Sequence, residues 1–166
     1  MADRNSQMLE IHSLSDAIRF LQELVEVNSQ FDEAQGVELV QSWVKKFLEH
    51  LGFTCELRPS SGSRFGPLLV AERLGDSPPQ NASEGQPRFV TLVTHADTVL
   101  PPFGKTPFAR LEGSDWAVGS GVIDNKGGLI TGLWAVQKYL HAPGRKHALR
   151  FICSPNEEIG SQGWTK

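Results

Sequence analysis

The sequence predicts an α/β fold, specifically a three-layer sandwich built around a mixed, mainly parallel sheet. Two stretches in the first third of the chain carry apolar residues at the spacing of helices. Several short apolar runs have the composition of strands. Further along, an apolar strand, a crossing segment, a helix and a second apolar strand follow one another, in the order that joins parallel strands.

Three helices are expected from this spacing. The first covers 13–28, where a serine can cap the amino terminus and apolar residues line one face. The second covers 34–52 with a similar apolar face, and Gly52 ends it. The third covers 125–144, where a Pro-Gly pair stops it.

The expected strands are short and apolar, and they lie at 53–57, 66–74, 88–94 and 147–154. The segment rich in Pro and Gly that follows the third strand is expected to include a short hairpin around Phe108 to Val118. A polar stretch at 75–87, also rich in Pro and Gly, predicts a surface loop.

Length and composition exclude several classes of protein. The 166 residues suffice for one domain, and 16 Lys and Arg against 19 Asp and Glu leave a net charge of −3. No basic stripe is available to bind nucleic acid, and no apolar run approaches the roughly 18 residues of a membrane span. The first residues lack the apolar core of a signal peptide, so we expect a cytoplasmic protein. Cys55 and Cys153 lie far apart in strand-like runs, which predicts two free thiols.

Polar residues gather at three places where predicted strands end or a helix begins. They are "THAD" at 94–97, "VIDNKGG" at 122–128 and "PNEE" at 155–158. In an open α/β sheet, the carboxyl ends of the strands line one edge, and sites form in the crevice there. The three groups are therefore expected to converge.

His95 and Asp97 form the first group. They are two positions apart in an extended segment, so their side chains point the same way. A metal-binding histidine usually gives its other ring N–H to a carboxylate or carbonyl, and Asp97 is one way to supply it. On its own, the pair is a weak signal, and a structural histidine beside a charge is the simpler interpretation.

Asp124 belongs to the second group. The spacing of Gly119, Gly121 and Asp124 does not fit a dinucleotide site, because a carboxylate would repel phosphate where that motif needs glycine. The glycines instead allow a tight turn that aims Asp124 into the crevice. An alternative for Asp124 alone is a helix cap.

Glu157 and Glu158 form the third group. Two adjacent carboxylates at a strand end repel each other unless a cation lies nearby. A hydrolytic metal site needs both a ligand carboxylate and a general base, and neighbouring side chains diverge enough to serve as one of each. In isolation the pair could be a solvated acidic turn. Taken together, one imidazole and several carboxylates suit a borderline cation such as zinc.

The segments "THADTV", "GSGVIDNKGG" and "PNEEIGSQG" resemble the three successive motifs of the M20 family of co-catalytic zinc peptidases and deacylases. They occur in that family's order, and the resemblance covers most of the chain. It is closest to the glutamate carboxypeptidase G2-like branch. The resemblance implies a zinc-exopeptidase-like fold, incomplete in this sequence, and a metallopeptidase or amidohydrolase activity.

The resemblance also implies a role for each residue. His95 would bind one Zn²⁺, Asp124 would bridge two, and Glu158 would bind the second, with Co²⁺ or Mn²⁺ as possible replacements. Glu157 would be the general base, and Asp97 would orient His95. In such enzymes the peptide bond after Asp124 is often cis.

Members of the family have two further ligands downstream and an inserted lid domain that forms a homodimer. We find neither in this sequence. Residues 1–166 are therefore expected to be the N-terminal portion of the catalytic domain, without the lid and the C-terminal catalytic portion, and to be inactive alone. Asn156 stands where many relatives carry an acid, which we expect to tune the site.

The expected substrate is a small peptide that loses its C-terminal amino acid, or an N-acyl amino acid. A deacylase of the succinyl-diaminopimelate or acetylornithine kind would share the same motifs. A non-catalytic binding module that kept the fold is an alternative of another class. Neither nucleic acid nor a membrane is an expected partner.

Overall fold

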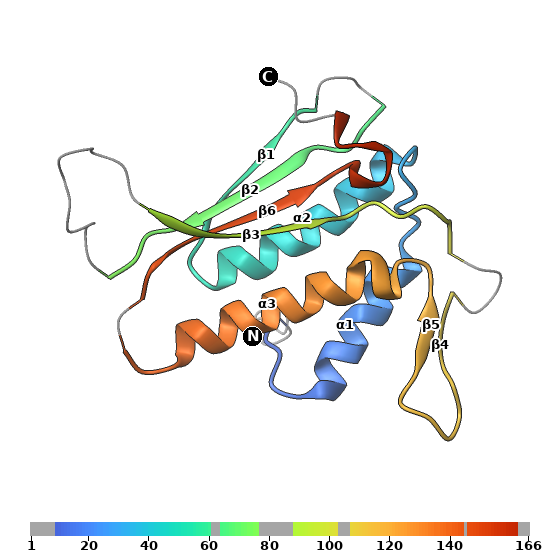
Figure 1. Cartoon of the computed structure of the whole chain (residues 1–166), viewed down its shortest axis with the longest axis horizontal. Helices are drawn as coiled ribbons and strands as arrows, with labels where there is room; N and C mark the ends of the chain where they lie inside the picture. Colours follow the sequence, from blue (N-terminus) through green and yellow to red (C-terminus); the bar gives the residue numbers. More distant parts are fainter. Residues whose placement is uncertain (1–8, 61–63, 77–87, 103–106, 145, 163–166) are drawn as a thin grey trace, which may run out of the picture.

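The main sheet has four strands in the order β1–β2–β6–β3 (Figure 1). The structure is a computed structural model that describes residues 9–60, 64–76, 88–102, 107–144 and 146–162. The strand bounds are Thr54–Arg58 for β1, Leu68–Arg73 for β2, Phe89–His95 for β3 and Ala148–Ser154 for β6. Residues 1–8 and 77–87, which include most of the predicted surface loop, lie outside the described residues.

The predicted α/β fold with a mixed sheet is confirmed, but the prediction of a mainly parallel sheet is wrong. β3 pairs with β6 in parallel, whereas β1 with β2 and β2 with β6 are antiparallel. The helical crossover from β3 to β6 was foreseen correctly. The segment that joins β1 to β2 is shorter than the dozen or so residues that a crossover between parallel strands needs, so these two strands pair antiparallel.

The three expected helices are present as α1 (Leu14–Glu26), α2 (Ala34–His50) and α3 (Gly128–His141). Ser13 caps α1 in a reciprocal arrangement with Asp16, in which each side chain accepts a hydrogen bond from the other's backbone N–H. The third helix begins three residues later than predicted. Residues Val122–Gly127 form a separate helical turn, η3, with non-helical backbone at its centre.

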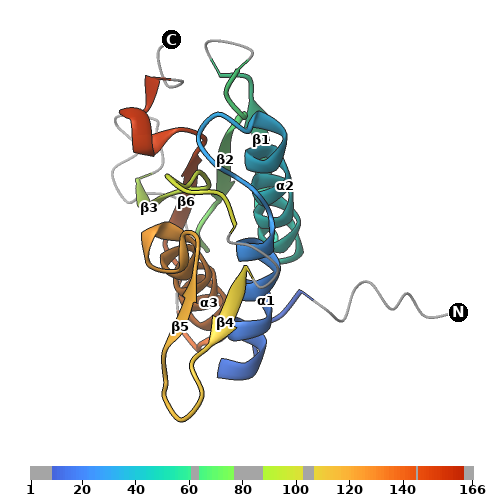
Figure 2. The same cartoon turned by 90° about the vertical axis from the view of Figure 1, so that its right-hand side faces the viewer.

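The three helices lie on one side of the sheet, where α2 packs against β1 and β2, α3 packs against β3, and α1 packs against α3. One core cluster joins the apolar faces of the helices to that sheet face, and it includes Phe20, Phe47, Leu133, Leu69 and Phe151. Figure 2 shows the sheet close to edge-on, with α2 lying along one side of it. The described residues therefore make two layers, where the sequence predicted three. On the opposite sheet face Val93 is 63% exposed, and no helix among the described residues covers it.

The predicted hairpin is present as β4 (Phe108–Arg110) and β5 (Ala117–Gly119), which pair antiparallel and project away from the sheet (Figure 1). Cys55 and Cys153 are both free thiols, as predicted. Among the described residues, no helix is long and apolar enough to cross a membrane.

Candidate metal centre

The parallel pairing of β3 with β6 brings two of the predicted groups to one edge. His95, the last residue of β3, lies opposite Ser154, the last residue of β6. One position further, the N–H of Ala96 donates to the carbonyl of Ser154 at 2.9 Å, so the pairing continues past both strands. The residues that follow each strand therefore start side by side.

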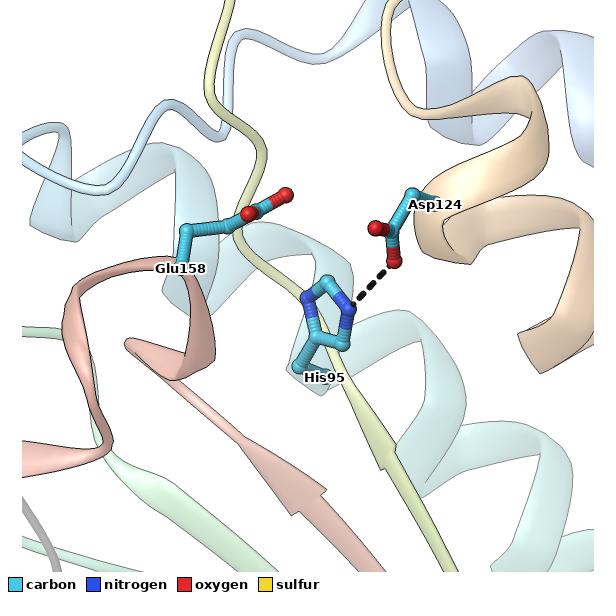
Figure 3. Close-up of side chains that lie close together, drawn as sticks. All are labelled: His95, Asp124 and Glu158. Carbon is cyan, nitrogen blue, oxygen red and sulfur yellow. Dashed lines mark hydrogen bonds and ion pairs between the residues drawn. The ribbon is translucent and has the colours of Figure 1, made fainter.

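Three of the predicted residues converge at this edge, one from each group (Figure 3). His95, Asp124 and Glu158 each present a ligand atom, and these atoms all lie within 4.8 Å of one another. Nε2 of His95 lies 2.9 Å from Oδ1 of Asp124. One imidazole with two carboxylates is a donor set that suits zinc and similar cations, so the residues fit a divalent metal ion.

His95 and Asp124 meet from opposite environments. The ring of His95 is buried at the end of β3, whereas the side chain of Asp124 is 71% exposed on η3. The turn that carries Asp124 begins at Gly121, whose φ of 72° favours glycine, and the N–H of Lys126 donates to the Gly121 carbonyl at 2.7 Å. The peptide bond from Asp124 to Asn125 is cis, as the resemblance implied.

The alternative of a helix cap at Asp124 is wrong. Helix α3 begins at Gly128, and no side chain caps its amino terminus. The carboxylate of Asp124 instead faces His95.

Glu157 lies beside this cluster but outside it. Its Oε2 is 3.9 Å from Nε2 of His95, and its side chain is 55% exposed. Glu157 also borders a pocket of about 370 Å³, whose other lining residues are Val93, Thr94, Asn125, Ser154 and Ser161. The two adjacent glutamates thus diverge, with Glu158 in the three-residue group and Glu157 on the pocket.

Asp97 lies underneath the cluster and is fully buried. Its Oδ1 is 3.2 Å from Nδ1 of His95, and its backbone carbonyl is 3.1 Å from the same nitrogen. The ring is therefore held on its Nδ1 side, and Nε2 is turned toward Asp124. Asp97 also accepts hydrogen bonds from the backbone N–H groups of Glu157 and Glu158, each at 3.0 Å.

The pKa values of His95 and Glu158 are both raised at this site. Burial alone would lower the pKa of His95, but hydrogen bonds with Asp97 and Asp124, and the negative charges of Asp97 and Glu157, raise it to about 9. The pKa of Glu158 is raised by partial desolvation and by the nearby charge of Asp124, with His95 acting in the opposite direction. Both shifts show that this edge accumulates negative charge, which a cation would neutralise.

Sequence reasoning missed the contribution of the linker at 27–33 between α1 and α2. The fully buried Ser29 donates its hydroxyl to the carbonyl of Ala96 at 2.8 Å, and its own carbonyl accepts from the N–H of Thr98 at 2.9 Å. The linker thereby fixes the backbone on both sides of Asp97. No sequence pattern marks a contact between residues so far apart.

Lys126 was missed as well. Its side chain is buried, and Nζ donates to the carbonyl of Val27 at 3.0 Å, which ties η3 to the same linker. Burial lowers the pKa of Lys126 to about 8. A lysine inside a glycine-rich turn is usually taken as exposed, so its sequence context gave no signal.

Residues 91–166 match the model of peptidase family M20/M25/M40. The chain is 31% identical over 149 residues to carboxypeptidase G2 of Pseudomonas sp. (strain RS-16), an alignment that covers 88% of this chain and 33% of that protein.

Solved structures show the same fold. Human carnosine dipeptidase 1 superposes with a TM-score of 0.70 at 19% identity, over 96% of this chain and 35% of that one. An M20 family metallo-carboxypeptidase, Sso-CP2 from Sulfolobus solfataricus, superposes with a TM-score of 0.64 at 22% identity, over 87% of this chain and 32% of that one. The chain thus spans about a third of the length of these relatives.

Proposed function

Because the chain belongs to peptidase family M20/M25/M40, we propose that it forms part of a di-zinc hydrolase that cleaves an amide bond in a small peptide or N-acyl amino acid. The observation that carries the proposal is the convergence of His95, Asp124 and Glu158, which come from three distant parts of the sequence. The relatives named carboxypeptidase and dipeptidase support a peptide as the substrate.

In this proposal, residues 1–166 are the N-terminal portion of the catalytic domain. Residues outside this sequence would supply the remaining metal ligands, the lid and the homodimer contact. The chain's length, about a third of that of its relatives, supports this division. Alone, residues 1–166 would bind metal weakly and would not turn over substrate.

His95, Asp124 and Glu158 would hold the metal through one imidazole and two carboxylates. The bound cation would polarise the substrate carbonyl and make a water molecule more acidic. His95 would present Nε2 to this centre, because Asp97 occupies its Nδ1 side.

Glu157 would be the general base. Its exposed carboxylate lies next to the cluster and borders the pocket, where it can reach an incoming water. Glu157 would accept a proton from the attacking water and deliver it to the leaving amine. The pocket beside it would receive the part of the substrate next to the scissile bond.

Zinc binding to the purified chain tests the metal centre. We expect His95→Ala and Glu158→Gln to weaken binding by at least the roughly 10- to 100-fold that loss of a supporting partner costs. His50→Ala and Glu72→Gln are the controls, because His50 pairs with Glu10 and Glu72 with Arg150, both outside the cluster. Equal losses in the controls, or steady hydrolysis of a dipeptide by residues 1–166, would contradict the proposal.

A further inference from the structure

The carboxylate of Asp97 holds the backbone of both glutamates. Oδ1 accepts the N–H of Glu157 and Oδ2 accepts the N–H of Glu158, so each oxygen holds one amide. These amides open the short helical turn η4 (Glu157–Ile159). The first N–H groups of a helix have no partner within it, so a carboxylate is well placed to satisfy them.

Asp97 is itself held in place from two sides. Its neighbour Ala96 pairs with Ser154 on β6, and its other neighbour Thr98 pairs with Ser29 of the linker 27–33. The carboxylate is fully buried, so no solvent competes for its oxygens. A buried acceptor on a fixed backbone determines where the groups that bind it must lie.

We propose that Asp97 is the positioning residue for the glutamate pair, because it fixes the backbone from which the side chains of Glu157 and Glu158 both start. This role is additional to its contact with His95. It adds a supporting residue to the proposed metal centre. Only its expected effect on metal affinity rests on the proposed function.

Holding the amides of Glu157 and Glu158 can be distinguished by experiment from orienting the His95 ring, because the two roles affect different parts of the site. A residue that only oriented His95 would leave η4 unchanged when it was replaced. A residue that holds both amides would release at least one of them. The amide protons of Glu157 and Glu158 therefore report on the role directly, without bound metal and without any measurement of activity.

Amide hydrogen exchange, followed by NMR on the metal-free chain, is the experiment. In the wild type we expect both amides to exchange slowly. Asp97→Asn has a single acceptor oxygen, so one amide should lose its partner and exchange at least about tenfold faster. Thr98→Val is the matched control, because the Thr98 hydroxyl donates to the carbonyl of Leu100 and not to the glutamates. It should leave both amides slow.

His95→Ala separates the two routes. It removes the imidazole and keeps Asp97, so the amides of Glu157 and Glu158 should stay as slow as in the wild type. Exchange that rises as much in His95→Ala as in Asp97→Asn would overturn the proposal. If Asp97→Asn does not fold, unprotected exchange of both amides in the wild type would overturn it, and slow exchange there and in His95→Ala would support it.

Zinc affinity gives the second measurement. Asp97→Asn should weaken binding by roughly 10- to 100-fold, and Thr98→Val should not. An unchanged affinity in a folded Asp97→Asn chain would count against the role. If the wild type binds no zinc, the proposed function fails, and the exchange data still decide whether Asp97 holds the pair.

Discussion

Oδ1 of Asp124 lies 2.9 Å from Nε2 of His95, although the two residues are 29 positions apart in the sequence. One side chain comes from an exposed turn and the other from the buried end of a strand. The protonated ring of His95 can donate its Nε2–H to this carboxylate, and a cation would compete with that proton for the ring nitrogen.

Zinc binding should release a proton at neutral pH. The pKa of His95 is raised to about 9, so the ring is protonated below that pH and must lose its proton to bind a cation. We expect about one proton released per zinc at pH 7.5, and an affinity that rises with pH up to about 9. Calorimetry in buffers of different ionisation enthalpy measures the release. Binding without proton release at pH 7.5 would show that the His95 ring is not charged.

The proposed general base can be distinguished from the proposed metal ligands in a longer, active protein that contains this chain. Glu157→Gln should lower kcat by about 10²- to 10⁴-fold, since the carboxylate that accepts the proton is lost. Metal content should not change, because Glu157 lies outside the three-residue group. Activity assays with a metal count measure both quantities. Loss of metal together with activity would make Glu157 a ligand instead.

The buried Lys126 should make stability rise with pH in the alkaline range. Its pKa is about 8 in the folded chain, well below that of an exposed lysine. Between pH 8 and about 10.5 the Lys126 amine is therefore protonated in the unfolded chain and neutral in the folded chain, so the contribution of Lys126 to the free energy of unfolding increases with pH. The contribution is on the order of 3 kcal/mol across this range. Denaturant unfolding of the wild type and Lys126→Met measures it, and equal pH slopes for the two would show that Lys126 is not desolvated.

The turn that carries Asp124 depends on glycine at position 121. An added Cβ would lie 2.5 Å from Cγ2 of Thr98, and φ is 72°. Gly121→Ala should therefore cost more than the roughly 1–2 kcal/mol of a left-handed backbone alone. Gly113 has the same φ with nothing within 4 Å of a built Cβ, so Gly113→Ala is the matched control. Thermal unfolding measures the loss of stability in both variants. Equal losses of stability would mean that the Thr98 side chain moves to accommodate the added methyl group at no cost.

The two faces of the sheet should respond differently to truncation. Phe151 is buried between β6 and the helices, so Phe151→Ala should cost about 3–5 kcal/mol. Val93 lies on the opposite face, and Val93→Ala should cost no more than about 0.5 kcal/mol in the isolated chain. Urea denaturation measures both. A large loss for Val93→Ala would indicate that this face is covered in solution.

Much of the fold follows from local patterns. Apolar spacing located α1 and α2, and strand composition located β3 and β6, because a half-buried element repeats its period along the chain. The expectation of a mainly parallel sheet was wrong for β1 and β2. It overlooked that the connection between them is too short for a crossover between parallel strands.

The sequence also predicted the residues of the candidate site, but not the contacts that support them. The placement of His95, Asp124 and Glu158 at strand ends and a helix start was enough to expect their convergence. The support beneath them was not predictable. The hydrogen bond from Ser29 to Ala96 and that from Lys126 to Val27 join residues that no periodicity links.

The linker between α1 and α2 contacts two segments of the site. Ser29 binds the backbone at Ala96, after β3, and the carbonyl of Val27 binds Lys126 on η3. A shortened chain that began at β1 would still contain every proposed ligand in its sequence. It would nevertheless lack the hydrogen bonds of Ser29 and Val27, which hold the segments that carry these ligands in place. For this protein, the three motifs are therefore not sufficient for a working site. The helices α1 and α2 are also required, although they contribute no proposed ligand, because the linker between them holds the backbone on which the ligands lie.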